Sequence, residues 1–247
     1  MGERVVVFGA TSAVAAEIAS LYAQRGARLH LVGRNPEKLA DVVRRCAPAE
    51  ITSTVADLSV TEDCERLVGE AFDALGGVDT VLVAQGDLGD QLASEGSFEH
   101  AESTLRLNFL GVVALVIPVA NRFEAARGGK ICVIGSVAGE RGRPRNYTYG
   151  SAKGALKLYL QGVRSRLHAK GVQVTTIMLG PVDSPMTVDH PKNALFGTPP
   201  DVARAIVRAV DRGVAEAYVP WYWGLIMPAV RAVPERLFQK LGFLSGR

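Results

Sequence analysis

The chain has 247 residues, a length that suits one large α/β domain better than two small ones and allows a substantial core. Its 28 Lys and Arg against 25 Asp and Glu give a formal net charge of +3, too mild a basic excess to indicate nucleic-acid binding. The cysteines Cys46, Cys64 and Cys132 are odd in number and far apart, which argues against disulfides and a zinc site. We therefore expect reduced thiols and no bound metal.

Two apolar segments bear on localisation. The N-terminal run Val5–Phe8 is too short for a signal peptide and predicts a strand. The longest uncharged apolar run, Ala217–Val230, is shorter than the roughly 20 residues that cross a bilayer and contains two prolines. We expect a cytoplasmic protein that at most rests on the inner surface of a membrane.

Short β-branched runs alternate with longer segments of helical spacing. The runs are nearly continuous in apolar residues, as expected for strands covered on both faces. This alternation predicts a single doubly wound Rossmann domain over residues 1–220, with a parallel seven-stranded sheet and helices on both faces. The expected strands are Arg4–Phe8, Arg28–Val32, Ile51–Val55, Thr80–Val83, Lys130–Ile134, Val172–Met178 and the edge strand Ala215–Val219. The expected helices are Ala13–Arg25, Pro36–Cys46, Thr61–Leu75, Phe98–Ala126, Tyr149–Lys170 and Pro200–Arg212.

The pattern loosens after the sixth strand. Residues Gly180–Pro200 hold five prolines and predict a loop. Residues 221–247 form an apolar and basic extension interrupted by prolines. We expect this extension to pack on the domain or to lie at a lipid interface.

The first expected strand leads into Gly9-Ala-Thr-Ser-Ala-Val-Ala15, and a helix follows. A tight turn that enters a helix places backbone N–H groups and the positive end of the helix dipole at an anion, which in this fold is a dinucleotide pyrophosphate. Because two of the usual three glycines are alanines, an ordinary strand–helix turn remains an alternative. The expected contacts are Gly9, Thr11, Ser12, Ala13 and Val14.

The next three strands are also followed by residues suited to a dinucleotide, at the edge of the sheet where ligands bind. An acidic residue after the second strand would bind the 2′-hydroxyl of NAD; Arg34 favours the 2′-phosphate of NADP(H), unless it is only solvated surface. Asp57, with Leu58, follows the third strand and could accept the adenine amino group. Ala84 and Gly86 follow the fourth strand and let backbone approach the ribose.

Tyr149 and Lys153 are four residues apart, so on a helix both lie on one face. A nearby ammonium favours the phenolate, and we expect Lys153 to lower the pKa of Tyr149 so that the phenol exchanges protons near neutral pH. The spacing alone is weak evidence. Tyr147 is a rival phenol, but its fourth neighbour is Ser151 rather than a lysine.

Six segments in this order resemble the short-chain dehydrogenase/reductase family over residues 4–220. They are the turn from Gly9 to Ala15, Ala84-Gln85-Gly86, Asn108 in a helix, Ser136 within Ile134–Gly139, Tyr149 with Lys153, and the loop Leu179-Gly180-Pro181-Val182-Asp183-Ser184. The resemblance implies an NADP(H) cofactor. Its further contacts are Tyr149, Lys153, Gly180, Pro181, Val182 and Ser184.

The resemblance also implies catalytic roles for four side chains. Tyr149 would give its proton to a carbonyl oxygen during reduction, and Ser136 would hydrogen-bond that oxygen. Lys153 would lower the Tyr149 pKa and hold the nicotinamide ribose, and Asn108 would fix a water that connects the lysine to solvent. The expected activity is the NADPH-dependent interconversion of a ketone and a secondary alcohol.

Three features depart from the family pattern. Ala13 adds a methyl group where backbone meets phosphate, and Ala15 replaces the glycine at the helix-packing position. Phe8 stands where the family has threonine. Leu179 replaces a proline before Gly180, which is expected to loosen the nicotinamide-side loop. None of these changes removes a catalytic group.

Two segments bear on the substrate. An arginine-rich loop lies between the catalytic serine and tyrosine, and arginine forks suit phosphate; a solvated rim or a subunit contact is the alternative. The C-terminal segment combines aromatic and basic residues, which suits a membrane interface, or a helix packed over the sheet or another subunit. The candidate substrate contacts are Arg141, Arg143, Arg145, His190 and Trp221.

Within the family, the stretch Ser136–Lys153 and the Val-Pro-Glu-Arg-Leu-Phe-Gln-Lys-Leu pattern from Val233 are similar to reductases of decaprenylphosphoryl-2-keto-erythro-pentose. That resemblance implies a sugar ketone on a polyprenyl phosphate, and the C-terminal segment would allow peripheral membrane contact. The alternatives are reduction of a soluble ketone, such as an acyl or cyclic secondary metabolite, and a non-catalytic dinucleotide-binding regulator. The family also implies a homodimer or homotetramer, paired through the long helices around Asn108 and after Tyr149.

Overall fold

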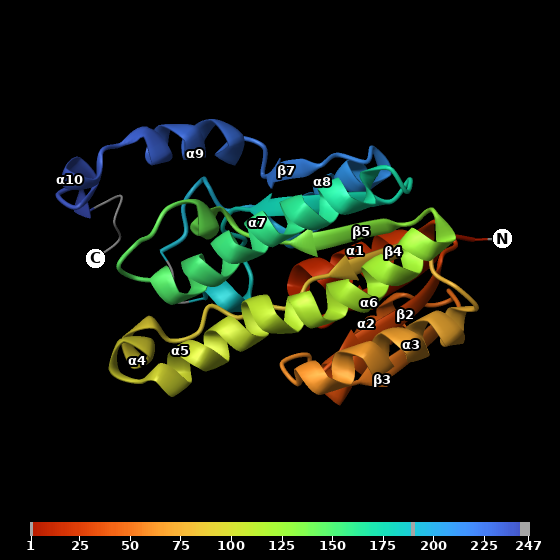
Figure 1. Cartoon of the computed structure of the whole chain (residues 1–247). Helices are drawn as coiled ribbons and strands as arrows, with labels where there is room; N and C mark the ends of the chain where they lie inside the picture. The colour runs from red at the N-terminus through yellow and green to blue at the C-terminus, as the bar shows by residue number, and fades with distance from the viewer. Residues whose placement is uncertain (1, 189–190, 243–247) are drawn as a thin grey trace.

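A seven-stranded parallel sheet forms the centre of the molecule, with the strand order β3-β2-β1-β4-β5-β6-β7 (Figure 1). The computed structural model describes residues 2–188 and 191–242. The predicted doubly wound parallel sheet is confirmed, with β7 at its edge. The strands are β1 Arg4–Phe8, β2 Arg28–Gly33, β3 Ile51–Val55, β4 Thr80–Val83, β5 Lys130–Ile134, β6 Gln173–Leu179 and β7 Glu216–Val219.

Helices cover both faces of the sheet, because strand side chains alternate between the faces. Val5 and Val7 of β1 join the apolar cluster under α1, α2 and α8, whereas Val6 and Phe8 join the cluster under α3, α6 and α7. The helices of the first layer are α1 Ala13–Gln24, α2 Pro36–Arg45 and α8 Pro199–Asp211. Those of the second are α3 Cys64–Leu75, α6 Gly111–Ala126 and α7 Tyr147–His168.

The long helix predicted over Phe98–Ala126 contains a wide turn. Helix α5 (Phe98–Leu105) passes into the π-helical turn η2 (Arg106–Leu110), and α6 follows. Asn108 lies in this turn, and its side-chain amide donates to the carbonyl oxygen of Thr104 at 2.9 Å. The side chain thereby satisfies a backbone group near the wide turn. Apolar periodicity did not reveal the turn, because the spacing on either side is that of an ordinary helix.

Residues 98–126 are also the one stretch in the described part of the chain whose length and mean hydropathy of 1.7 would allow it to cross a membrane. Here the stretch is a core helix. Its apolar residues Val112, Leu115 and Val119 are fully buried in the cluster shared with α3 and α7.

Several short elements were missed in the sequence. They are α4 (Gln91–Gly96), the 3-10 turns η1 (Thr61–Asp63), which begins the expected third helix, and η3 (Val137–Glu140), and the turn η4 (Pro185–Thr187) inside the predicted loop. Helix α7 also begins two residues before its predicted start. Elements of one turn are too short for periodicity to identify.

The C-terminal segment lies against the domain in this structure. Helix α9 (Trp223–Ala232) and the short α10 (Glu235–Phe238) follow β7 and extend past the carboxyl ends of the strands (Figure 1). Met227 and Phe238 are buried in a separate small cluster with Met178 of β6 and Val137 of η3. The segment therefore has an apolar anchor on the loop that follows β5.

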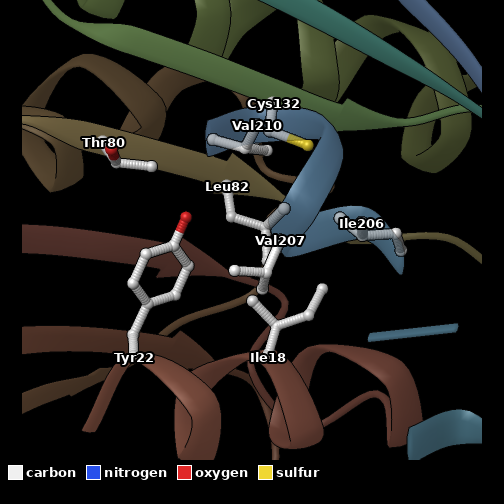
Figure 2. A pocket seen from close by; sticks show the side chains of 8 residues that line it. All are labelled: Ile18, Tyr22, Thr80, Leu82, Cys132, Ile206, Val207 and Val210. Atoms are coloured by element: carbon white, nitrogen blue, oxygen red, sulfur yellow. The ribbon is translucent and has the colours of Figure 1, made fainter. Parts of the chain in front are cut away.

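A small gap remains in the core between α1, α8 and the strands β4 and β5 (Figure 2). Tyr22 and Cys132 are among its lining residues, and the space is too small to hold a water molecule. The Tyr22 hydroxyl has no hydrogen-bond partner among the described residues, and burial raises the pKa of the Cys132 thiol to about 12. We regard both groups as packing elements.

Candidate active site

A cleft of about 1080 Å³ lies along the carboxyl ends of the strands, where ligands bind in open parallel sheets. The loops after β1 to β6 form most of its walls, and α9 forms part of one side. Every residue that the sequence identifies as a cofactor contact lines this cleft: Gly9, Thr11, Ser12, Ala13, Val14, Arg34, Asp57, Leu58, Ala84, Gly86, Tyr149, Lys153, Gly180, Pro181, Val182 and Ser184.

The turn after β1 has the shape of an anion site. Gly9 has a φ of +80°, and a Cβ there would lie 2.6 Å from the backbone nitrogen of Gln85, so only glycine fits. The Ser12 side chain caps α1 by accepting a hydrogen bond from the backbone N–H of Ala15 at 3.1 Å. The first two residues of α1 line the cleft, so the positive end of the helix dipole lies at its wall.

Two cationic side chains line the cleft beyond β2. Arg34 follows the last residue of the strand, and Lys38 lies in the first turn of α2. The backbone N–H of Lys38 donates to the side chain of Asn35, which caps this helix, at 2.8 Å. Lys38 was missed in the sequence, because a lysine near a helix start is usually surface. The signal in the sequence that could have found Lys38 is its position four residues after Arg34, just inside a predicted helix.

Asp57 presents a carboxylate at the end of β3. One of its oxygens accepts hydrogen bonds from the backbone N–H of Ser59 at 2.9 Å and from its hydroxyl at 2.8 Å. These bonds, the backbone one first, hold the pKa of Asp57 below its usual value. The other oxygen has no partner in the described part of the chain, which suits it to accept a hydrogen bond from an amino group.

Ser136, Tyr149 and Lys153 come together at one wall of the cleft, and all three are buried. Ser136 is the N-cap of η3, where its side chain accepts from the backbone N–H of Ala138 at 3.1 Å. The Lys153 amine lies 5.7 Å from the centroid of the Tyr149 ring, one turn along α7. It also donates to the carbonyl oxygen of Ile134 at 3.2 Å, two residues before the serine.

Three glycines allow η3 to pack directly on α7. A Cβ on Gly139 would lie 2.6 Å from the backbone nitrogen of Gly154, and one on Gly154 would lie 2.8 Å from the carbonyl oxygen of Gly139. A Cβ on Gly150 would lie 2.9 Å from the carbonyl oxygen of Ala138. This backbone contact fixes the serine beside the two catalytic candidates on α7.

Burial opposes the charged form of both groups on α7. It raises the pKa of the Tyr149 phenol to about 12; a hydrogen bond with Ser136 acts in the opposite direction, and Asp87 adds to the rise. Burial also lowers the pKa of the Lys153 amine to about 8. The sequence predicts that Lys153 lowers the Tyr149 pKa; in the structure the pKa is instead raised by burial, and the group that lowers it is Ser136, through a hydrogen bond.

Asn108 is fully buried behind the cleft wall. Its amide donates to the carbonyl oxygen of Asp87 at 2.8 Å, and its Oδ1 accepts from the Asp87 N–H at 3.2 Å. A Cβ on Gly86 would lie 2.9 Å from this Oδ1 and 3.4 Å from the Lys153 amine. The asparagine thus holds the segment after β4 in place, and Gly86 leaves room for the lysine.

The expected substrate contacts lie in three different places. Arg143 and Arg145 line the cleft. Arg141 does not: its guanidinium pairs with the carboxylate of Glu235 at 2.7 Å and lies 4.3 Å from the centroid of the Phe238 ring. Arg141 was expected to contact the substrate. In the structure its guanidinium is instead bound to the C-terminal segment.

The remaining two expectations concern His190 and Trp221. His190 lies outside the described residues. Trp221 is 73% exposed and is not part of the cleft wall, whereas Trp223 is 7% exposed and lines it. The structure thus brings Trp223, which the sequence did not single out, to the cleft in place of Trp221. The spacing of Trp223, Ile226 and Val230, which all line the cleft from α9, is the helical pattern that distinguishes the two.

Trp223 packs edge-on against the loop after β6. A Cβ on Gly180 would collide with the indole Nε1, so the glycine makes room for the ring. This Nε1 is buried and has no hydrogen-bond partner among the described residues.

Glu140 connects the catalytic region to the C-terminal segment. Its carboxylate is 1% exposed, pairs with Lys157 of α7 at 2.5 Å and accepts from the Tyr218 hydroxyl of β7 at 2.8 Å. Arg231 of α9 lies 3.8 Å away. A single glutamate in an arginine-rich loop gives no sequence signal for this role, because its partners Lys157, Tyr218 and Arg231 lie far along the chain. Across residues 2–188 and 191–242, no group of three or more His, Cys, Asp or Glu side chains is arranged to hold a metal ion.

Known proteins resemble this chain over most of its length. A family model described as short chain dehydrogenase matches residues 3–194. An uncharacterized oxidoreductase of Mycobacterium tuberculosis is 31% identical over 240 residues, which cover 96% of each chain. One from Streptomyces coelicolor is 33% identical over 240 residues, covering 96% of this chain and 95% of the relative.

The fold is also found in solved structures. A short chain dehydrogenase from Burkholderia cenocepacia, in complex with NADP, superposes with a TM-score of 0.83 at 21% identity and covers 97% of both chains. A second short chain dehydrogenase/reductase family protein has a TM-score of 0.78 at 23% identity, covering 88% of this chain and 95% of that one. Likeness at this identity concerns the fold.

Proposed function

The chain belongs to the short chain dehydrogenase family, and we propose that it uses NADP(H) to interconvert a ketone and a secondary alcohol. One observation carries the proposal. Ser136, Tyr149 and Lys153 meet at one wall of a cleft, and the predicted dinucleotide contacts line that same cleft. Proton transfer and cofactor binding would thus occur in one continuous space.

Tyr149 is the proposed proton donor in reduction and acceptor in oxidation. A phenol whose pKa burial raises to about 12 is protonated at neutral pH, which suits donation to a carbonyl oxygen. Ser136 would hydrogen-bond the same oxygen and orient it. The bound nicotinamide would supply or accept hydride.

Lys153 is the proposed group that returns the proton to Tyr149. Its pKa of about 8 allows the amine to exchange protons near neutral pH. Asn108, which holds the Asp87 backbone next to Gly86, would order the water through which this exchange reaches solvent.

Support for NADP(H) rather than NAD(H) comes from the end of β2. Arg34 and Lys38 both line the cleft there, and a 2′-phosphate would meet two cations. The similar Burkholderia cenocepacia protein is in complex with NADP. The Gly9 turn, the helix start at α1 and the free oxygen of Asp57 fit the remaining parts of a dinucleotide.

Tyr149→Phe tests the proposal. It should lower turnover of a ketone by roughly 10²–10⁴-fold, because the proton donor is lost, while NADPH affinity stays within a factor of a few. Tyr147→Phe is the matched control: this rival phenol is 43% exposed and is not among the lining residues. Stopped-flow turnover and fluorescence titration with NADPH measure both quantities.

Two outcomes would contradict the proposal in different ways. Unchanged turnover in Tyr149→Phe would reject the assigned chemistry. Intact NADPH binding without NADPH oxidation across a broad panel of carbonyl compounds would favour the dinucleotide-binding regulator instead.

Two substrate classes are retained in the proposal: a 2-keto sugar on a polyprenyl phosphate, and a soluble acyl or secondary-metabolite ketone. The exposed apolar side chains Trp221, Leu225 and Leu237 on the C-terminal segment support the lipid-linked class. Trp221→Ser with Leu225→Ser tests this without removing Trp223 from the cleft. Loss of binding to anionic vesicles, with turnover of a water-soluble ketone preserved, would support it. Unchanged vesicle binding would favour the soluble substrate.

We also propose a cytoplasmic homodimer or homotetramer. The described cysteines Cys46, Cys64 and Cys132 are free and buried, which suits a reducing compartment. Ile117 of α6 and Leu158 of α7 are 46% and 71% exposed, and their burial between subunits would explain why apolar side chains lie there. Light scattering of Leu158→Lys, which should shift the protein toward the monomer, checks this.

A further inference from the structure

Two pairs of cations line the cleft from different parts of the chain. Arg34 and Lys38, after β2, are assigned to the cofactor. Arg143 and Arg145 lie on the loop between η3 and α7, between the catalytic serine and tyrosine in the chain. The chemistry assigned to Ser136, Tyr149 and Lys153 does not use this second pair.

Among the described residues, no carboxylate pairs with Arg143 or Arg145. Arg143 is the less exposed of the two, and its Nε is buried without a hydrogen-bond partner in the described part of the chain. Burial and the charge of Arg145 both lower the pKa of the Arg143 guanidinium, which nevertheless stays protonated at physiological pH. Arg141, by contrast, is paired with Glu235.

Such an arrangement is unfavourable until an anion arrives. Partial burial removes water from the Arg143 guanidinium, and Arg145 repels it, so an oxyanion that accepts from both would recover the loss. Asp87 is a carboxylate that also lines the cleft, but one of its oxygens accepts from the backbone N–H of Gly89 at 2.8 Å. It pairs with neither arginine among the described residues.

The same cleft offers apolar surface. Trp223, Ile226 and Val230 of α9 line it. A ligand that meets these groups would carry an anionic group on one part and apolar carbon on another. The carbonyl that reacts would lie at Ser136 and Tyr149.

We propose that the substrate carries an anionic group, a phosphate ester or a carboxylate, and that Arg143 and Arg145 bind it while α9 contacts its apolar part. The inference rests on the proposed function, since it names the substrate class of that same site. The anion can belong to a lipid-linked phosphate or to a soluble phosphate or carboxylate. Both share the chemistry that the arginines recognise.

The test uses the full chain saturated with NADP⁺, so that the cofactor's own phosphates do not compete. Trp221→Phe leaves Trp223, at the cleft wall, as the sole tryptophan of the chain. Its fluorescence then reports titration with dodecyl phosphate, dodecanoate, inorganic phosphate and neutral dodecyl maltoside, each below its micellar concentration. The variants are Arg143→Gln and Arg145→Gln, and Arg66→Gln on α3 is the charge-matched control.

We expect Arg143→Gln to weaken dodecyl phosphate about 10–100-fold, as the loss of a charge-assisted bond does. Arg145→Gln should weaken it several-fold, and Arg66→Gln should leave it unchanged. Arg145 is exposed, so Arg145→Gln should fold normally. If Arg143→Gln folds poorly, the affinity of the Arg145→Gln variant for dodecyl phosphate tests the anion site. Measurable binding of inorganic phosphate would indicate a soluble substrate, and a requirement for the alkyl chain would indicate a lipid-linked one.

Equal affinity of dodecyl phosphate for the wild type and both arginine variants would overturn the inference. Equal affinity of the wild type for dodecyl phosphate and for neutral dodecyl maltoside would also overturn it. The proposed function fails separately. Arginine-dependent anion binding by a protein that oxidises no NADPH with any carbonyl would reject the activity and retain the anion site. Ketone turnover with arginine-independent binding would do the reverse.

Discussion

The two ends of the cleft are built in different ways. The cofactor end consists of short turns at the ends of β1 to β4, each fixed by its own residues, such as the left-handed Gly9 and the N-cap Ser12. The substrate end consists of side chains from the loop after β5 and from α9, which lie far apart in the chain. The first end is therefore encoded locally, and the second depends on tertiary packing.

The two ends of the cleft also differ in the contacts that fix their residues in place. At the cofactor end, backbone geometry places the ligand groups. At the substrate end, α9 and α10 are held by the apolar cluster around Met227 and Phe238. Glu140 also contacts Arg231 of α9, and Arg141 pairs with Glu235 of α10. Substitutions in α9 should therefore alter substrate selection while the dinucleotide site is retained.

The largest expected effect is on Trp223. Trp223→Ala should lower the free energy of unfolding by about 3–5 kcal/mol, because it leaves a cavity beside Gly180. Trp221→Ala, at the 73% exposed position, should change it by less than about 0.5 kcal/mol. Urea unfolding followed by far-UV circular dichroism measures both, since the substitutions themselves alter the fluorescence.

Trp223→Phe extends this test to function, because it keeps an aromatic ring but reduces the apolar surface that α9 presents to the cleft. We expect a higher KM for the substrate and an unchanged dissociation constant for NADPH. Equal costs of the two alanine substitutions would show that α9 does not form the cleft wall.

The next effect lies at the cofactor end. Arg34→Ser should raise the KM for NADPH about 10–100-fold, because a charge-assisted contact to the 2′-phosphate is lost. The KM for NADH should remain the same, and the difference between the variant and the wild type should shrink as salt is added. Arg44→Gln, on the same helix as Lys38 but absent from the cleft lining, is the control. An equal effect on both cofactors would contradict the assignment.

Between the two ends, Lys153 should make stability depend on pH. Its pKa is about 8 in the folded protein and near 10.5 when the chain is unfolded, so the unfolded chain binds more protons between these values. The free energy of unfolding should therefore rise from pH 8 to 10, on the order of 1–3 kcal/mol. The Tyr149 pKa, raised from 10.0 to about 12, acts in the opposite direction only above pH 10.

Lys153→Met isolates this contribution. The variant should lack the rise between pH 8 and 10, and the difference between wild type and variant cancels most other titrating groups. Parallel curves for the two proteins would mean that burial does not depress the lysine pKa.

The sequence predicted most where local rules suffice. The alternation of apolar runs and helical spacing was enough for the seven parallel strands, and all sixteen residues named as cofactor contacts lie along the cleft. The π-helical turn at Asn108 was not predictable from spacing, because the helices on either side of it have ordinary helical spacing. Trp223 was missed because composition does not say which of two nearby tryptophans faces the core.

The smallest expected effect is that of Arg141→Gln, which distinguishes a residue that contacts the substrate from one that supports the fold. Its side chain is 16% exposed, pairs with the 67% exposed Glu235 and lies over Phe238. A partly exposed ion pair and a cation–π contact together contribute roughly 1 kcal/mol, so Arg141→Gln should lower the free energy of unfolding by about that amount. Because the side chain does not line the cleft, the KM for an anionic substrate should change less than in Arg143→Gln. Steady-state kinetics on the two variants with one ketone, beside their unfolding curves, separates the roles: a larger rise in KM for Arg141→Gln would return this arginine to the substrate site and place α10 in a different position.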